Sequence, residues 1–139
     1  MDALSPAQAA VLADVVLAVH AAVVLFAVGG LLAIVLGGLL GWRWVRRPSF
    51  RIAHIGLVVF VALQAWLDRL CPLTVWEQAL RGHAGQPVHE VGFIEHWLGA
   101  LIFFEAPPWV FVLAYTAFAA AVALAWWWLP PRRALRQPR

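Results

Sequence analysis

The fold is decided by residues 9–40, AAVLADVVLAVHAAVVLFAVGGLLAIVLGGLL, an apolar run interrupted only by Asp14 and His20. A helix needs roughly 20 apolar residues to cross the hydrocarbon core of a bilayer, so this run is long enough to cross with tilt or to protrude at one end. Two further runs, at about residues 51–70 and 109–129, are also long enough to cross. The sequence therefore predicts an all-α integral membrane protein with three transmembrane helices.

The composition indicates lipid as the surrounding medium. Of the 139 residues, 64% are hydrophobic and 12% are charged, whereas soluble domains carry about 25% charged residues. Such a chain lacks the charge to cover a water-facing surface, which argues against a soluble domain, a disordered chain and a nucleic-acid-binding protein. Cys71 is the single cysteine, so an internal disulfide is excluded.

Two arginine clusters orient the chain. All ten basic residues are Arg, and eight lie either in WRWVRRPSFR at residues 42–51 or after residue 131. Positively charged segments stay cytoplasmic, so both clusters are expected on that side. The first cluster follows the first span, so the chain must cross an even number of times between the two clusters. The total number of crossings is therefore odd. Residues 93–104 are short for a crossing and should only dip into the outer leaflet. The expected topology anchors are Arg43, Arg46, Arg47, Arg51, Arg132, Arg133 and Arg136.

This topology makes residues 1–139 a single membrane domain with its N-terminus outside and its C-terminus in the cytoplasm. Residues 71–108 form an extracytoplasmic cap. We expect the cap to contain a short amphipathic helix, opened by a capping box at residues 74–77, and a short re-entrant or interfacial helix over residues 93–104. A four-helix transmembrane bundle, in which residues 93–104 cross, is the alternative.

Small residues mark helix faces that are expected to pack against neighbours. Glycines recur at helical spacings in the first span, and alanines do so in the last span. Small side chains let helix backbones approach closely in lipid, so these faces indicate helix packing or self-association. The expected packing residues are Gly30, Gly37, Gly41, Ala114, Ala117, Ala121 and Ala125.

Polar side chains gather near the end of the spans opposite the basic loop. Counting from that loop at 1.5 Å per residue, His20 lies level with residues 68–71, and the cap lies near the same rim. Ionisable groups at membrane depth are costly and indicate function. Each also has a structural explanation, such as an interhelical hydrogen bond for His20 or the capping box for Glu77. The candidate rim cluster is His20, Asp68, Cys71, Thr74, Glu77, Glu95 and His96.

Two motifs give the chain a resemblance to a known family. They are Cys71-Pro72-Leu73-Thr74 followed by Glu77, and Gly92-Phe93-Ile94-Glu95-His96. Together with His20 in the first span and His54 after the basic loop, they resemble the domain-of-unknown-function 2784 family of small bacterial membrane proteins. The similarity covers most of the chain, from about Leu12 to the end of the last span. It implies a multi-span protein of the bacterial inner membrane, and it supplies no activity, substrate or cofactor.

Three classes of function remain open. We expect a non-enzymatic accessory, assembly or self-associating membrane subunit, because small residues form packing faces and the short chain leaves little room for a translocation path. The alternative is a metal- or haem-binding module at the extracytoplasmic rim, with His20 and His96 as ligands. A second alternative is a membrane enzyme acting on a lipid or isoprenoid, with His96 or His20 as general base. The expected partners are the lipid bilayer and a second copy or a larger membrane complex, with no nucleic acid.

Overall fold

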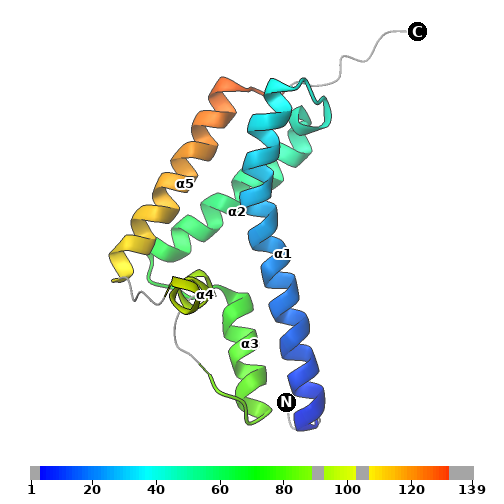
Figure 1. The fold of residues 1–139 in the computed structure, drawn as a ribbon, viewed down its shortest axis with the longest axis vertical. Coiled ribbons are helices and arrows are strands. Elements are labelled where there is room, and N and C mark those ends of the chain that lie inside the picture. The colour runs from blue at the N-terminus through cyan, green and yellow to red at the C-terminus, as the bar shows by residue number, and fades with distance from the viewer. Residues whose placement is uncertain (1–3, 89–92, 103–106, 132–139) are drawn as a thin grey trace, which may run out of the picture. The chain divides into compact units, whose positions relative to one another are not determined.

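The computed structural model describes residues 4–88, 93–102 and 107–131, and over these residues it is helical with no strand (Figure 1). The long helices are α1 (Pro6–Leu39), α2 (Pro48–Trp66) and α5 (Pro108–Trp128). The short helices are α3 (Pro72–His83) and α4 (Phe93–Ile102), and a 3-10 helix, η1 (Trp44–Arg46), precedes α2. The prediction of an all-α fold is confirmed for the described residues.

The helices α1, α2 and α5 are each long and apolar enough to cross a membrane. Their apolar windows have mean hydropathies of 2.6, 1.5 and 1.9, yet only 17%, 22% and 11% of the residues in these windows are buried inside the protein. Apolar surface of this extent is stable against lipid tails and marks a membrane-facing surface. The prediction of three helices able to span a membrane is therefore confirmed within the described part of the chain.

Three helices end in the same way, with a residue of positive φ just beyond the last turn. Gly41 follows α1 with a φ of 77°, Gly85 follows α3 with 71°, and Asp68 follows α2 with 51°. The amide of the next residue then donates to a carbonyl of the last turn, at 2.7 to 2.9 Å, which is the Schellman type of helix end. Because Asp68 turns the chain in this way, α2 ends at Trp66, before the end near residue 70 that the apolar run suggested.

By their contacts the helices divide into two compact units. The first unit comprises Met1–Val23 and Gln64–Val112, and it contains the N-terminal part of α1 together with α3 and α4. The second unit comprises Val24–Leu63 and Leu113–Arg139, and it contains the rest of α1 with most of α2 and α5. With 34 residues, α1 contributes to both units.

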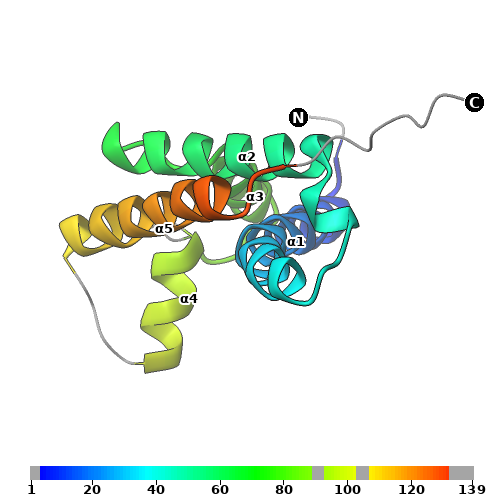
Figure 2. The same cartoon turned by 90° about the horizontal axis from the view of Figure 1, so that it is seen from above.

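In the second unit, α1, α2 and α5 pack against one another (Figures 1 and 2). Gly30 of α1 faces the ring of His54 on α2, and a Cβ atom at Gly30 would lie 2.5 Å from Cδ2 of that ring. Arg51 of α2 donates to the carbonyl of Ala125 on α5 at 2.9 Å. The start of α2 thus lies beside the end of α5. Within this unit α1 and α5 run in the same direction, and α2 runs against them.

In the first unit, α3 carries two buried polar residues. It begins after Cys71 with Pro72 at its first position, where the missing N–H of proline costs nothing. Thr74 and Glu77 are 1% and 3% exposed. The expected capping box at these two residues is wrong, because Pro72 starts the helix one turn earlier. Cys71 is the N-cap and makes no side-chain cap bond, which leaves Thr74 and Glu77 free to contact other side chains of the unit.

Candidate functional site

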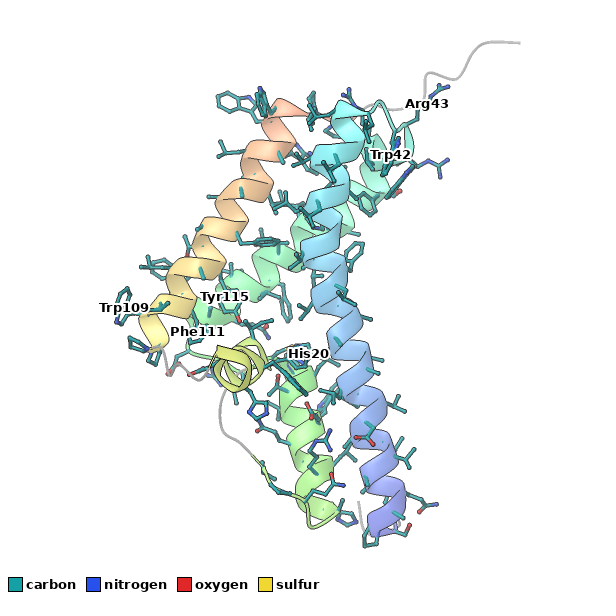
Figure 3. All side chains as sticks on the ribbon, in the orientation of Figure 1. His20, Trp42, Arg43, Trp109, Phe111 and Tyr115 are labelled. Atoms are coloured by element: carbon teal, nitrogen blue, oxygen red, sulfur yellow. The ribbon has the colours of Figure 1, made fainter. Side chains whose placement is uncertain are left out.

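His20 lies at the centre of the polar contacts in the first unit. The residue is 6% exposed, and its side chain points from α1 toward the short helices (Figure 3). Its Nδ1 atom lies 3.5 Å from Oγ1 of Thr74 on α3. Its ring lies against the ring of Phe93 on α4, with 4.3 Å between the centroids. One histidine thus connects α1 to both short helices.

Arg81 on α3 connects the carboxylates of the same unit. Its Nε atom donates to Oε1 of Glu77 at 2.7 Å, and its Nη2 atom donates to Oδ1 of Asp14 on α1 at 3.2 Å. Its Nη1 atom donates to the side chain of Gln86 at 2.8 Å. The hydrogen bond with Glu77 raises the pKa of Arg81 above its usual range, so this guanidinium stays charged at any working pH. The buried carboxylate therefore always has a cation beside it, which offsets the cost of removing it from water.

The expected rim cluster is only partly assembled. His20, Thr74 and Glu77 are buried in the same unit, the first two in contact. Asp68 is exposed, because it occupies the left-handed turn that ends α2. Cys71 is half-buried at the start of α3. Three of these five side chains are therefore buried within the first unit, and the other two are not.

The two remaining members of the rim cluster, Glu95 and His96, are half-buried on α4. The ring of His96 lies against Trp97, with 5.7 Å between the centroids. Within the described residues, no group of three or more His, Cys, Asp or Glu is placed to hold a metal ion. The pairing of His20 with His96 on a metal or haem stays a prediction.

Two residues of the second unit form buried polar contacts that the sequence did not predict. Arg51, expected only as a topology anchor, is 2% exposed, and its guanidinium lies 5.3 Å from the ring centroid of Trp126. His54, one turn later, is fully buried and donates from Nε2 to the carbonyl of Ala27 on α1 at 2.8 Å. Among the described residues, Nε of Arg51 and Nδ1 of His54 are buried without a hydrogen-bond partner. The i, i+3 spacing of these residues, which puts both on one face of α2, was the available signal.

The expected packing glycines have two different roles. Gly30 and Gly37 are sites of close approach, since a Cβ atom at Gly37 would lie 2.8 Å from the ring of Trp42. Gly41 has open space around it and ends α1 through its positive φ, so it does not belong to a packing face. Glycine is favoured there because other residues rarely adopt this backbone conformation.

The expected packing alanines of α5 range from buried to exposed. Ala125 is 8% exposed and its carbonyl accepts the hydrogen bond from Arg51. Ala121 is half-buried, and Ala114 and Ala117 are exposed. The small-residue face of α5 is therefore covered near its C-terminal end and open toward its N-terminal end.

The remaining topology anchors surround η1 or follow α5. Arg43 and Arg47 are exposed, and Arg46 is half-buried and donates to the carbonyl of Gly38 at 3.5 Å. Arg132, Arg133 and Arg136 lie outside the described residues.

Comparison with known proteins identifies a family. Residues 10–131 match the family described as Protein of Unknown function (DUF2784), which covers α1 from its second turn through the end of α5. The searches of curated proteins and of solved structures found no match to the chain. The predicted resemblance is confirmed, and the chain belongs to the DUF2784 family of proteins of unknown function.

Proposed function

We propose that the protein is a non-enzymatic membrane subunit that acts as an accessory or assembly factor or by self-association. The observation that carries this proposal is the pairing of polar side chains in the first unit. His20 contacts Thr74, and Arg81 binds Glu77 and Asp14. The contact of His20 with Thr74 and the bond of Arg81 to Asp14 each join α1 to α3, whereas Glu77 and Arg81 pair within α3. Contacts that join helices in this way support a structural role for these side chains.

The open part of the small-residue face supports association with another helix. Ala114 and Ala117 are exposed on α5. Apolar side chains gain little by leaving lipid for a helix interface, so association in a membrane relies on close backbone packing at small residues. A second copy of the chain or another membrane protein is the partner that such a face accommodates.

Size-exclusion chromatography with light scattering on the detergent-solubilised protein tests this association. We expect a defined particle mass above that of one chain. Ala114→Leu should lower that mass by keeping the backbones apart. Ala123→Leu is the matched control, since Ala123 is also exposed but lies on the opposite side of α5, and it should change nothing. A wild-type protein that is strictly monomeric and brings no partner from native membranes would contradict the proposal.

We also propose a topology, in a bacterial inner membrane, for a single membrane domain. α1, α2 and α5 cross, the N-terminus lies outside, the C-terminus lies in the cytoplasm, and residues 71–108 form an extracytoplasmic cap. α4 has ten residues and a length of about 15 Å, half of the roughly 30 Å core, which supports an interfacial or re-entrant position. The hydrogen bond from Arg51 to Ala125 brings the start of α2 beside the end of α5. It therefore supports a position on the same side of the membrane for these two helix ends, as the arginine clusters require.

Labelling with a maleimide that cannot cross the inner membrane tests the topology, in cells whose inner membrane is intact. In a Cys71→Ser background, Val88→Cys introduces a thiol in the cap, where Val88 is 49% exposed. Ser49→Cys introduces a matched thiol beside the basic loop, where Ser49 is also exposed. We expect the first variant to be labelled in cells with a permeabilised outer membrane, and the second only after lysis. The reverse pattern would overturn the orientation, and labelling of neither variant after lysis would show that both sites lie within the bilayer.

A further inference from the structure

The loop between α1 and α2 is held in a defined conformation. Val45 is 1% exposed and acts as its anchor. A Cβ atom at Gly37 would lie 2.9 Å from the side chain of Val45, so the loop packs directly onto the backbone of α1. The amide of Trp42 donates to the carbonyl of Gly37 at 2.7 Å. The ring of Trp42 lies against the same position, 2.8 Å from a Cβ atom at Gly37, so the loop is seated on α1 by both side chains.

Aromatic and basic side chains alternate along the loop. The rings of Trp42 and Trp44 are stacked, with 6.2 Å between centroids and 22° between planes, and they are 43% and 45% exposed. Arg43 and Arg47 are exposed beside them, and Figure 3 shows Arg43 projecting from the loop. A shallow, open concavity is lined by Trp42, Arg43, Trp44 and Arg47.

These arginines have no carboxylate in their own unit to neutralise them. The second unit contains eight of the ten arginines and none of the seven Asp and Glu residues of the chain. Among the described residues, the carboxylates in ion pairs, Asp14 and Glu77, are held by Arg81 of the first unit. The second unit therefore supplies no carboxylate that could pair with the arginines around η1.

We propose that Trp42, Arg43, Trp44 and Arg47 form a binding site for the phosphate group of an anionic phospholipid. The loop joins two helices able to cross a membrane, so it lies at the depth of the lipid headgroups, where tryptophan rings are most stable. The guanidinium fork matches the geometry of phosphate oxygens. Basic clusters next to membrane helices attract anionic lipids. The site is independent of the proposed association, because it uses no residue of the α5 alanine face.

Native mass spectrometry of the full-length protein in detergent micelles tests the site. The probes are dioleoyl phosphatidylglycerol and dioleoyl phosphatidylcholine, which share acyl chains and a phosphate but differ in net charge. The test variant is Arg43→Gln/Arg47→Gln, and the matched control is Arg132→Gln/Arg133→Gln, which removes the same charge from the same unit. A third variant, Trp42→Leu/Trp44→Leu, keeps the charge and removes the ring walls.

We expect the wild type to retain phosphatidylglycerol in preference to phosphatidylcholine. Affinity for phosphatidylglycerol should fall roughly five-fold for each loop arginine removed. In the tail control, Arg132→Gln/Arg133→Gln, the loss of affinity should be smaller. The tryptophan variant should also lose affinity. Arg43 and Arg47 are exposed, so the test variant should have the same midpoint denaturant concentration of unfolding as the wild type. If the double variant does not fold, the two single variants provide the same test.

Three results would overturn the proposal. Equal retention of the two lipids by the wild type would show that charge does not select the ligand. Equal losses in the loop variant and the tail control would show diffuse attraction without a site. Complete displacement of phosphatidylglycerol by millimolar inorganic phosphate would identify a soluble phosphate compound as the ligand.

Discussion

The two contact units of the chain have opposite charge. The first unit has two arginines against seven Asp and Glu residues, a formal charge of −5, whereas the second unit has eight arginines and no carboxylate, a charge of +8. Together they give the net charge of +3. Buried polar side chains in the first unit can therefore pair with side chains of opposite charge, while those in the second unit must find neutral acceptors.

The observed hydrogen bonds follow this difference. In the first unit Arg81 donates to the carboxylates of Glu77 and Asp14. In the second unit Arg51 and His54 donate to backbone carbonyls of neighbouring helices. A helical carbonyl that already accepts a bond within its helix has a second lone pair for such a donor. Cations can thus be buried among apolar helices without a carboxylate, provided that the helices approach closely.

Close approach in the second unit predicts the largest effect of a substitution. Gly30→Ala places a methyl group 2.5 Å from Cδ2 of the buried ring of His54, which its bond to Ala27 holds in place. We expect a loss of about 2 kcal/mol in the free energy of unfolding, the usual cost of overpacking. Denaturant titration in micelles, followed by tryptophan fluorescence, measures it.

Gly29→Ala is the matched control, because a Cβ atom there meets nothing within 4 Å. It should be neutral or slightly stabilising, since alanine favours a helix over glycine. In a His54→Ala background the penalty of Gly30→Ala should disappear. A penalty that persists in that background would mean that the ring of His54 is not its source.

Side-chain pairing in the first unit predicts the next largest effect. The carboxylate of Glu77 accepts from Arg81 at 2.7 Å, and 96% of the side-chain surface of Glu77 is buried. Glu77→Gln removes this charged acceptor and should lower the free energy of unfolding by about 2 kcal/mol. Arg81→Gln should cost at least as much, since Arg81 also binds Asp14 and Gln86. The two losses should be less than additive in the double variant, measured by the same titration. Full additivity would show that the two side chains do not stabilise each other.

The helix ends predict smaller effects of opposite sign in the two units. Gly41 in the second unit and Asp68 in the first both adopt positive φ after a helix. Gly41→Asp should destabilise the protein by about 1 kcal/mol, and Asp68→Gly should stabilise it by a similar or smaller amount, because only glycine adopts this conformation without strain. Thermal unfolding of the two variants compares them. A stabilising effect of Gly41→Asp would contradict this interpretation.

The smallest effect is expected at the edge of the first unit. Asp14 binds Arg81 at 3.2 Å, but 69% of its side chain is exposed. Exposed ion pairs contribute little, so Asp14→Asn should change the free energy of unfolding by less than about 0.5 kcal/mol. Repeating the titration at high salt should abolish even this difference. A loss as large as that of Glu77→Gln would show that Asp14 is the principal partner of Arg81.

The sequence indicated which segments carry the candidate polar residues, but it did not indicate which of their side chains contact one another. The spacing of Glu77 and Arg81 by four residues is a local signal for an ion pair on one helix. The partners of His20 come from two helices that are distant in sequence, and no local pattern specifies them. Asp68 and Cys71 were expected beside His20 because of their height in the membrane, but they form the end of α2 and the start of α3.

The sequence by itself determined that the chain is helical, that three of its helices can cross a membrane, and that its positive charge is concentrated around two helix ends. These properties are sums over consecutive residues, because the hydropathy and length of a helix do not depend on its neighbours. Only the tertiary structure decided which polar side chains meet, and that Arg51 and His54 are buried. A side-chain contact depends on the rotation and crossing of each helix, which are set by close approach at residues such as Gly30 and by turns such as that at Asp68.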